Sequence, residues 1–113
     1  MRLQDLLVYV AGPIGDDPMH GARTACLAGA DLLEAGLTPV VPQLSVFWDF
    51  LAPRPYEEWI AYDLCVLARC DALLRLKGES PGADQEVAFA EARGIPVFHS
   101  KGVLYAWAKE RCE

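Results

Sequence analysis

The sequence contains no long apolar run, and this excludes one class of protein at the outset. No segment approaches the roughly 18 consecutive apolar residues of a membrane-spanning helix. The first residues, Met1–Asp5, are followed by a short predicted strand and are not typical of a signal peptide. We therefore expect a cytoplasmic protein without a membrane partner.

Basic residues are also scarce. The chain has 10 lysines and arginines against 16 aspartates and glutamates, which gives a formal net charge of −6. A surface with this balance disfavours binding to nucleic acid or to an anionic membrane. At 113 residues and 53% hydrophobic composition, the chain fits a single domain, residues 1–113. These bounds favour a small molecule as the partner.

The usual metal and cofactor motifs are missing as well. The four cysteines include no Cys-x-x-Cys pair, and neither histidine has a partner at ligand spacing. No Gly-x-Gly-x-x-Gly fingerprint follows the first predicted strand. We therefore expect no metal and no nicotinamide or flavin cofactor, so that catalysis would depend on side chains alone.

Short apolar runs alternate with longer helical segments along the chain. Strands are predicted at residues 6–11, 38–41, 72–76 and 95–98. Helices are predicted at about 16–35, 56–69 and 103–111, with another that contains Glu86 and ends at Gly94. This alternation predicts an α/β fold in which right-handed crossovers connect the strands of a parallel sheet.

The segment between Pro42 and Pro55 is predicted to be irregular. It carries Phe47, Trp48 and Phe50. A long aromatic connection is uncommon in a small domain unless it forms a lid, a binding loop or an oligomer contact. A loop that only packs its own aromatic rings is equally compatible with this pattern.

Glu86 lies about one turn inside the helix that follows Ser80-Pro81-Gly82. In an open α/β sheet, ligands bind beyond the carboxyl ends of the strands, and a glycine-containing turn lets backbone amides approach them. This position suits a catalytic carboxylate. An acid in the first turn that complements the helix dipole is the alternative interpretation.

Two further residues are placed for chemistry. Asp63 lies at helical spacing from Trp59 and Leu67, so we expect it on the apolar stripe of its helix. A carboxylate there needs a partner or has a raised pKa; a salt bridge to Arg69 or Arg75 is the alternative. Tyr9 precedes the end of the first strand, where its hydroxyl can hydrogen-bond a carboxylate or a sugar, or simply belong to the core.

Four short segments together resemble the nucleoside 2-deoxyribosyltransferase superfamily, most closely its short DUF4406-like branch. They occur in the same order over residues 8–98. They read Tyr9-Val10-Ala11-Gly12-Pro13-Ile14, Asp63-Leu64 with Cys70-Asp71-Ala72-Leu73, Ser80-x-Gly82-x-x-x-Glu86, and Gly94-Ile95-Pro96-Val97. The resemblance implies a Rossmann-like (flavodoxin-like) three-layer fold with a parallel sheet of four to five strands.

The resemblance also implies an enzyme that cleaves the N-glycosidic bond of a (deoxy)nucleoside or a nucleoside 5′-monophosphate. Glu86 matches the nucleophile that forms a covalent glycosyl-enzyme, Asp63 the acid that orients or protonates the departing base, and Tyr9 the residue that positions the nucleophile. Two carboxyl groups in different environments suit these two roles. Transfer to another base would make the protein a transferase, and transfer to water a hydrolase.

Several residues are predicted to bind the substrate. Trp48 and Trp59 offer flat faces on which a base can stack. Ser80 matches a phosphate-binding serine of the monophosphate hydrolases, whereas Asp16 and Asp17 would repel a phosphate unless they cap the following helix. The remaining residues expected to contact substrate, from the matched segments, are Gly12, Pro13, Ile14 and Gly82.

The exposed aromatic residues and the habit of this family lead us to expect a homo-oligomer. The competing interpretation of the whole chain is a non-catalytic module that binds a nucleotide or senses a nucleotide-derived signal, because the same pocket would serve both functions.

Overall fold

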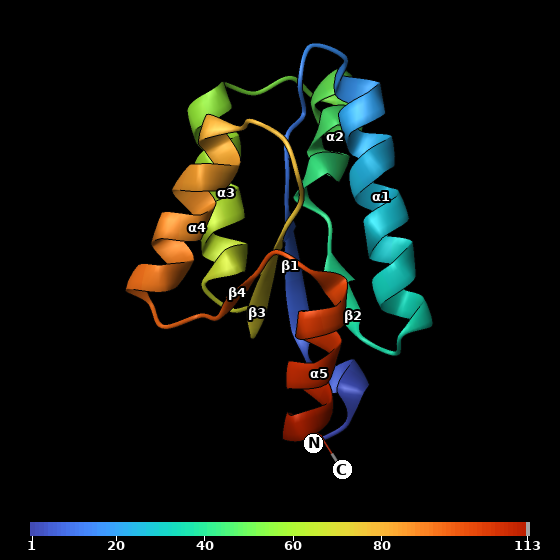
Figure 1. The fold of residues 1–113 in the computed structure, drawn as a ribbon. Coiled ribbons are helices and arrows are strands. Elements are labelled where there is room, and N and C mark those ends of the chain that lie inside the picture. Colours follow the sequence, from blue (N-terminus) through green and yellow to red (C-terminus); the bar gives the residue numbers. More distant parts are fainter. Residues whose placement is uncertain (113) are drawn as a thin grey trace.

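The structure is a computed structural model that describes residues 1–112, so Glu113, the last residue of the predicted domain, lies outside it. It contains a four-stranded parallel sheet in the order β2-β1-β3-β4 (Figure 1). The strands are β1 (Leu7–Ala11), β2 (Thr38–Val40), β3 (Ala72–Arg75) and β4 (Val97–Phe98). The predicted α/β class and parallel sheet are confirmed, and this strand order is the flavodoxin-like one.

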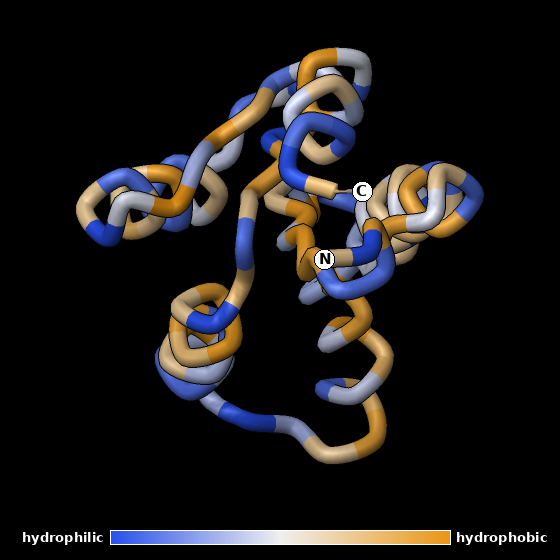
Figure 2. Tube along the Cα trace, turned by 90° about the horizontal axis from the view of Figure 1, so that it is seen from below, coloured by the Kyte–Doolittle hydropathy of each residue, from blue (hydrophilic) through white to orange (hydrophobic). Residues whose placement is uncertain are grey.

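Helices cover both faces of the sheet and give three layers. On one face lie α1 (Pro18–Glu34) and α5 (Lys101–Arg111), and on the other α3 (Tyr56–Leu67) and α4 (Pro81–Ala92). Figure 2, a view from below, shows helices on both sides of the central strands. Among residues 1–112, no helix combines the length and the apolarity that crossing a bilayer requires.

The central strand β1 contributes to both hydrophobic cores. Val8 and Val10 pack in the core with α1 and α5, whereas Tyr9 and Ala11 pack in the core with α3 and α4. Successive side chains of a strand point to opposite faces, so a strand covered on both sides must be apolar throughout. Tyr9 is the polar exception, and it points toward α3 and α4.

Helix α1 begins and ends where the sequence predicts. The side chain of Asp17 accepts a hydrogen bond from the backbone N–H of His20, at 3.2 Å, and Pro18 occupies the first turn. Gly36, at a φ of +91°, follows the helix in the left-handed region that favours glycine. Asp17 therefore caps the helix, which was one of the two roles considered for it; the other was the repulsion of a phosphate.

The prediction of an irregular chain between Pro42 and Pro55 is wrong. This segment forms a 3₁₀ turn, η2 (Pro42–Leu44), and a short helix, α2 (Ser45–Leu51). Its valine, phenylalanine and tryptophan residues have modest helix propensity, which conceals the helix in the sequence. Trp48 stabilises α2 by packing against two aromatic residues of α3, so tertiary contacts override the local preference.

Strand β4 is shorter than predicted and contains only Val97 and Phe98. The N–H of Ile95 donates to the carbonyl of Ala90. Ile95 therefore belongs to the end of α4 and does not extend β4. Pro96 has no N–H, although its carbonyl accepts from Leu73 at 3.0 Å. Such a residue is tolerated because β4 is the edge strand.

Candidate active site

A tyrosine and a glutamate form the centre of the candidate site. The Tyr9 hydroxyl, from β1, donates a hydrogen bond to Oε2 of Glu86, from α4. Tyr9 is fully buried, and Glu86 is 8% exposed. Glu86 shares the inward stripe of α4 with Ala83 and Ala90, at intervals of three and four residues that keep the three on one face. The fold thus directs the carboxylate into the protein and toward the sheet.

Three influences set the protonation of Glu86. Burial raises the pKa of its carboxyl group, whereas the hydrogen bond from Tyr9 and the positive charge of Arg75 act in the opposite direction. The pKa of Tyr9 is itself raised, first by burial and then by the charge of Glu86, so the phenol keeps its proton and remains a donor. Tyr9 is therefore the donor and the Glu86 carboxyl group the acceptor of their hydrogen bond, and the pKa of Glu86 is on balance raised.

Asp63, on α3, has the opposite character. It is half-buried, and its Oδ1 atom is buried without a hydrogen-bond partner among the described residues. Burial, followed by the charge of Glu86, raises the pKa of Asp63 to about 7. Tyr9 and Arg75 act to stabilise the anion of Glu86, whereas Oδ1 of Asp63 has no such donor within residues 1–112.

The salt bridges considered for Asp63 are not formed. Nη1 of Arg69 donates to the carbonyl of Cys65, at 2.7 Å, and Arg75 pairs with Asp84. No ion pair found within residues 1–112 includes Asp63. Its carboxyl group is therefore available to a ligand.

Tyr9 and Asp63 face one cavity. It has a volume of about 210 Å³ and opens between the end of β2, α2 and α3. Its walls are mostly apolar, and the lining residues that carry a hydroxyl or carboxyl group are Tyr9, Ser45, Tyr62 and Asp63. Glu86 does not line this cavity directly and reaches it through Tyr9. The lining residues are Tyr9, Val40, Val41, Pro42, Leu44, Ser45, Trp48, Tyr62, Asp63 and Val66.

Trp48 and Tyr62 form the aromatic part of the wall, and Trp59 packs against both of them. The ring centroid of Trp48 lies 5.1 Å from that of Trp59 and 5.6 Å from that of Tyr62, both in edge-to-face geometry. Oδ1 of Asp49 accepts from the indole N–H of Trp59, at 2.8 Å, and from the backbone N–H of Arg54, at 2.9 Å. Asp49 thereby ties α2 to α3. Trp48 and Tyr62 remain 48% and 47% exposed, so the cavity is open to a flat ligand.

The loop after β1 lies close to the sheet but not on this cavity. A Cβ atom at Gly12 would lie 3.0 Å from the side chain of Leu76, and one at Gly78 would lie 3.0 Å from Pro13. The carbonyl oxygen of Ile14 would lie only 2.3 Å from a Cβ at Gly21. Glycine is thus required where this loop contacts α1.

Ser80 caps α4, because its hydroxyl oxygen accepts from the N–H of Ala83 at 3.0 Å. Gly82, in the first turn, lies near the hydroxyl of Tyr56.

The structure thus brings four of the predicted site residues together, Tyr9, Asp63, Trp48 and Glu86, and Trp59 packs against Trp48. The other predicted site residues lie at the same end of the sheet but do not line the cavity. They are Gly12, Pro13, Ile14, Ser80 and Gly82.

Sequence reasoning did not identify Gln43. This buried side chain donates from Nε2 to the carbonyls of Val10 and Gly12, at 3.2 and 3.4 Å, where β1 continues beyond the end of β2. It replaces the missing strand partner, while its Oε1 is buried without a partner in the described part of the chain. A glutamine after Pro42 was the only signal in the sequence, and it is a weak one.

A second cavity lies at the opposite end of the molecule, beside η1 (Leu3–Asp5). It has a volume of about 170 Å³ and includes Leu37, Tyr105 and Lys109 in its walls. No residue with a carboxyl side chain lines it within residues 1–112. The chemistry-bearing residues therefore belong to the first cavity.

Comparison with models of protein families gives no match, and comparison with curated proteins gives none either. Among solved structures, the chain is similar to a 2-desoxiribosyltransferase from Leishmania mexicana, with a TM-score of 0.63 and 19% identity. The match covers 81% of this chain but only 61% of that one.

The chain is also similar to a 2-deoxyribosyltransferase from the psychrotolerant bacterium Bacillus psychrosaccharolyticus, with a TM-score of 0.59 and 20% identity. Here the match covers 80% of this chain and 69% of the other. At such identities the likeness shows a shared fold, and the activity has to be argued from the site.

Proposed function

We propose that this protein cleaves the N-glycosidic bond of a (deoxy)nucleoside or nucleoside 5′-monophosphate, as a member of the short DUF4406-like branch of the nucleoside 2-deoxyribosyltransferase superfamily. The observation that carries the proposal is the pairing of Glu86, which accepts from Tyr9, with Asp63, whose pKa is raised to about 7, beside one cavity. Two carboxyl groups in different protonation states are what glycoside cleavage requires.

In the first step, the Glu86 carboxylate, which lies one hydrogen bond beyond Tyr9 from the cavity, attacks the anomeric carbon of a sugar that has entered as far as Tyr9. A C–O ester bond forms as the C–N bond breaks, and the electron pair of the broken bond remains on the nitrogen of the base. Asp63 donates its proton to the departing base, so that the base leaves neutral. Tyr9 holds Glu86 in place, and Trp48 and Tyr62 provide faces for stacking.

In the second step, a nitrogen of another base, or the oxygen of water, attacks the same carbon and releases Glu86 as the carboxylate. Asp63, now an anion, takes up the proton that the incoming group loses. A base as acceptor gives transfer, and water gives hydrolysis. The stacking wall of Trp48 and Tyr62 favours an acceptor base, because a second flat ring binds where the first one left.

Self-association is the remaining part of the proposal. Helix α2 exposes Phe47, Phe50 and Leu51 by 60%, 80% and 65%. Exposed apolar side chains gathered on one short helix are typical of an interaction surface. We expect a symmetric homo-oligomer that covers them.

The experiment is an assay of base release from deoxynucleosides, ribonucleosides and their monophosphates, with and without a free acceptor base. Glu86→Gln should lower turnover by at least about a thousandfold while binding persists. Glu91→Gln, the same change at an exposed position of α4, is the matched control and should retain activity. Intact-mass measurement of the acid-quenched wild-type protein should detect the glycosyl adduct.

Saturable binding of a nucleoside without release of any base would contradict the enzymatic proposal. It would support a nucleotide-binding module in its place.

A further inference from the structure

Arg75 is the last residue of β3 and lies on the same side of the sheet as Glu86. It pairs in register with Ala11 of β1, two residues beyond Tyr9. Leu73, two residues earlier on β3, packs in the core with α4, and alternate residues of a strand share a face. The Arg75 side chain is only 10% exposed. A buried guanidinium needs a definite set of partners, because an unpaired buried charge is costly.

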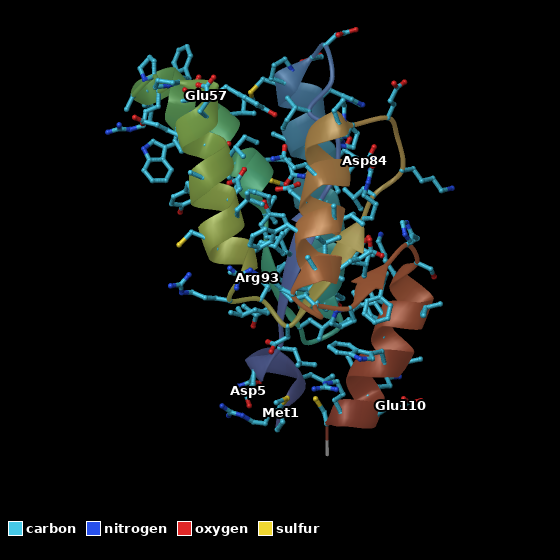
Figure 3. The ribbon with its side chains drawn as sticks, turned by 90° about the vertical axis from the view of Figure 1, so that its left-hand side faces the viewer. Met1, Asp5, Glu57, Asp84, Arg93 and Glu110 are labelled. Carbon is cyan, nitrogen blue, oxygen red and sulfur yellow. The ribbon has the colours of Figure 1, made fainter. Side chains whose placement is uncertain are left out.

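Those partners come from three successive parts of the chain. Nη1 donates to the carbonyl of Leu76, and Nη2 donates to the carbonyl of Gly78, at 2.9 Å, and to Oδ1 of Asp84, at 3.1 Å. Figure 3 shows Asp84 at the upper end of α4, where the helix begins. One side chain therefore joins the end of β3, the β3–α4 connection and the first turn of α4.

Glu86 follows Asp84 by two residues on this helix. The titratable and charged groups that face it and its partner are Tyr9 on β1, Asp63 on α3, Arg75 on β3 and Cys70 just after α3. Burial raises the pKa of the Cys70 thiol to about 11, so it stays neutral. Of the groups within residues 1–112 that act on the pKa of Glu86, Arg75 is the one cation.

We propose that Arg75 is a positioning residue for Glu86. Its fork of hydrogen bonds fixes the start of α4, two residues before Glu86 on the same helix, and it places a permanent positive charge at that end of the helix. The guanidinium donates to backbone carbonyls and to Asp84, so it acts through α4 and does not bind the substrate itself. The inference rests on the proposed function of Glu86.

The experiment compares Arg75→Met, Arg75→Lys and Arg93→Met. Methionine keeps the apolar stem and removes the charge, so the pKa of Glu86 should rise and the acidic limb of the kcat/KM profile should move to higher pH by about one unit. Arg75→Lys keeps the charge and should leave the limb in place while kcat falls. Arg93, at the other end of α4, contacts the ring of Phe89. Its substitution should change neither the position of the acidic limb nor kcat.

A second readout does not depend on turnover. Titration of the Glu86 side-chain carboxyl by ¹³C NMR should show the same rise in Arg75→Met. If no nucleoside is cleaved but this titration shifts, the effect of Arg75 on Glu86 is supported and the proposed function fails. If the wild type is active and the limb and the titration are both unchanged in a folded Arg75→Met, the inference is overturned.

Asp84→Asn tests the same charge from the other side. Asp84 is 71% exposed, so the variant should fold even if Arg75→Met does not. Removing the anion that partly neutralises Arg75 should lower the pKa of Glu86, a shift opposite in sign to that of Arg75→Met. A rise, or no change, would count against Arg75 as the counterion.

Discussion

The hydroxyl of Tyr9 donates to the carboxylate of Glu86, although the two residues stand 77 positions apart in the sequence. The strand that carries Tyr9 is central and buried on both faces, and the helix that carries Glu86 packs on one of them. The hydrogen bond therefore stabilises the anion of Glu86, whereas Oδ1 of Asp63 has no donor among the described residues. Burial raises the pKa of Asp63 to about 7.

Tyr9→Phe removes this donor while it keeps the aromatic ring. We expect the pKa of Glu86 to rise, so that the acidic limb of the pH–rate profile moves to higher pH, and kcat to fall by about 10- to 100-fold at neutral pH. Steady-state assays over a range of pH values measure both effects. Tyr105→Phe, on α5, loses only a bond to the carbonyl of Asp31 and should leave the profile unchanged. A profile that is identical in Tyr9→Phe would contradict the role of Tyr9.

Asp63 should supply the basic limb of the same profile. Its carboxyl must be protonated to act as an acid, so activity should decline as pH rises through about 7. Asp63→Asn has no proton to donate, and we expect kcat to fall by about 10²- to 10⁴-fold with loss of this limb. For a substrate with a better leaving group, Asp63→Asn should lower kcat by a smaller factor. An equal fall in kcat for all substrates would argue against proton donation by Asp63.

The same variant tests the effect of Asp63 on stability. Its pKa is about 7 in the folded protein, against an ordinary value of 3.8, so between these values the folded state binds more protons than the unfolded one. The free energy of unfolding should therefore decrease as pH rises from about 4 to 7. Asp63→Asn should reduce this slope but not abolish it, because the raised pKa of Glu86 contributes with the same sign. Thermal unfolding at a series of pH values measures the difference.

Trp48→Ala should weaken the binding of a nucleoside by about 1–3 kcal/mol, since it removes a face on which the base stacks. Calorimetric titration with an uncleaved nucleoside analogue, or with the Glu86→Gln variant, gives the affinity. Phe50→Ala, on the same helix, is the control, because Phe50 is 80% exposed and does not line the cavity. Equal affinities of the two variants would remove α2 from the binding site.

Gly21→Ala should destabilise the protein by about 1–3 kcal/mol, because the new Cβ would lie 2.3 Å from the carbonyl oxygen of Ile14. The strain would displace the loop that follows β1. Gly102→Ala is the matched change near the start of α5, where the nearest atom is the Ser100 hydroxyl oxygen at 3.6 Å, and it should be neutral or stabilising. Chemical denaturation of the two variants provides the comparison.

The sequence predicts those elements whose physical cause is local. Continuous apolar character identifies β1, and a cap followed by proline identifies the start of α1. The pairing of Tyr9 with Glu86 was expected only through the resemblance of short motifs to a family. Nothing in the spacing of the two residues predicts that they meet.

The features that the sequence did not predict depend on tertiary contacts. Helix α2 depends on the packing of Trp48 against Trp59 and Tyr62, which lie on another helix. Gln43 has a function only because β2 ends before β1 does, and Arg75 only because α4 begins beside it. Neither the contact of Gln43 with β1 nor that of Arg75 with α4 produces a sequence pattern from which it could be predicted.

The position of β1 at the centre of the sheet also affects how the protein is made. Both strands that flank β1 in the finished sheet follow it in the chain, so Tyr9 is synthesised before either of them. A nascent chain that ends before β2 therefore exposes an apolar segment without its partners, and Glu86 reaches Tyr9 only after α4 has been synthesised. Recovery of catalysis during translation or refolding would report the docking of α4 onto the sheet.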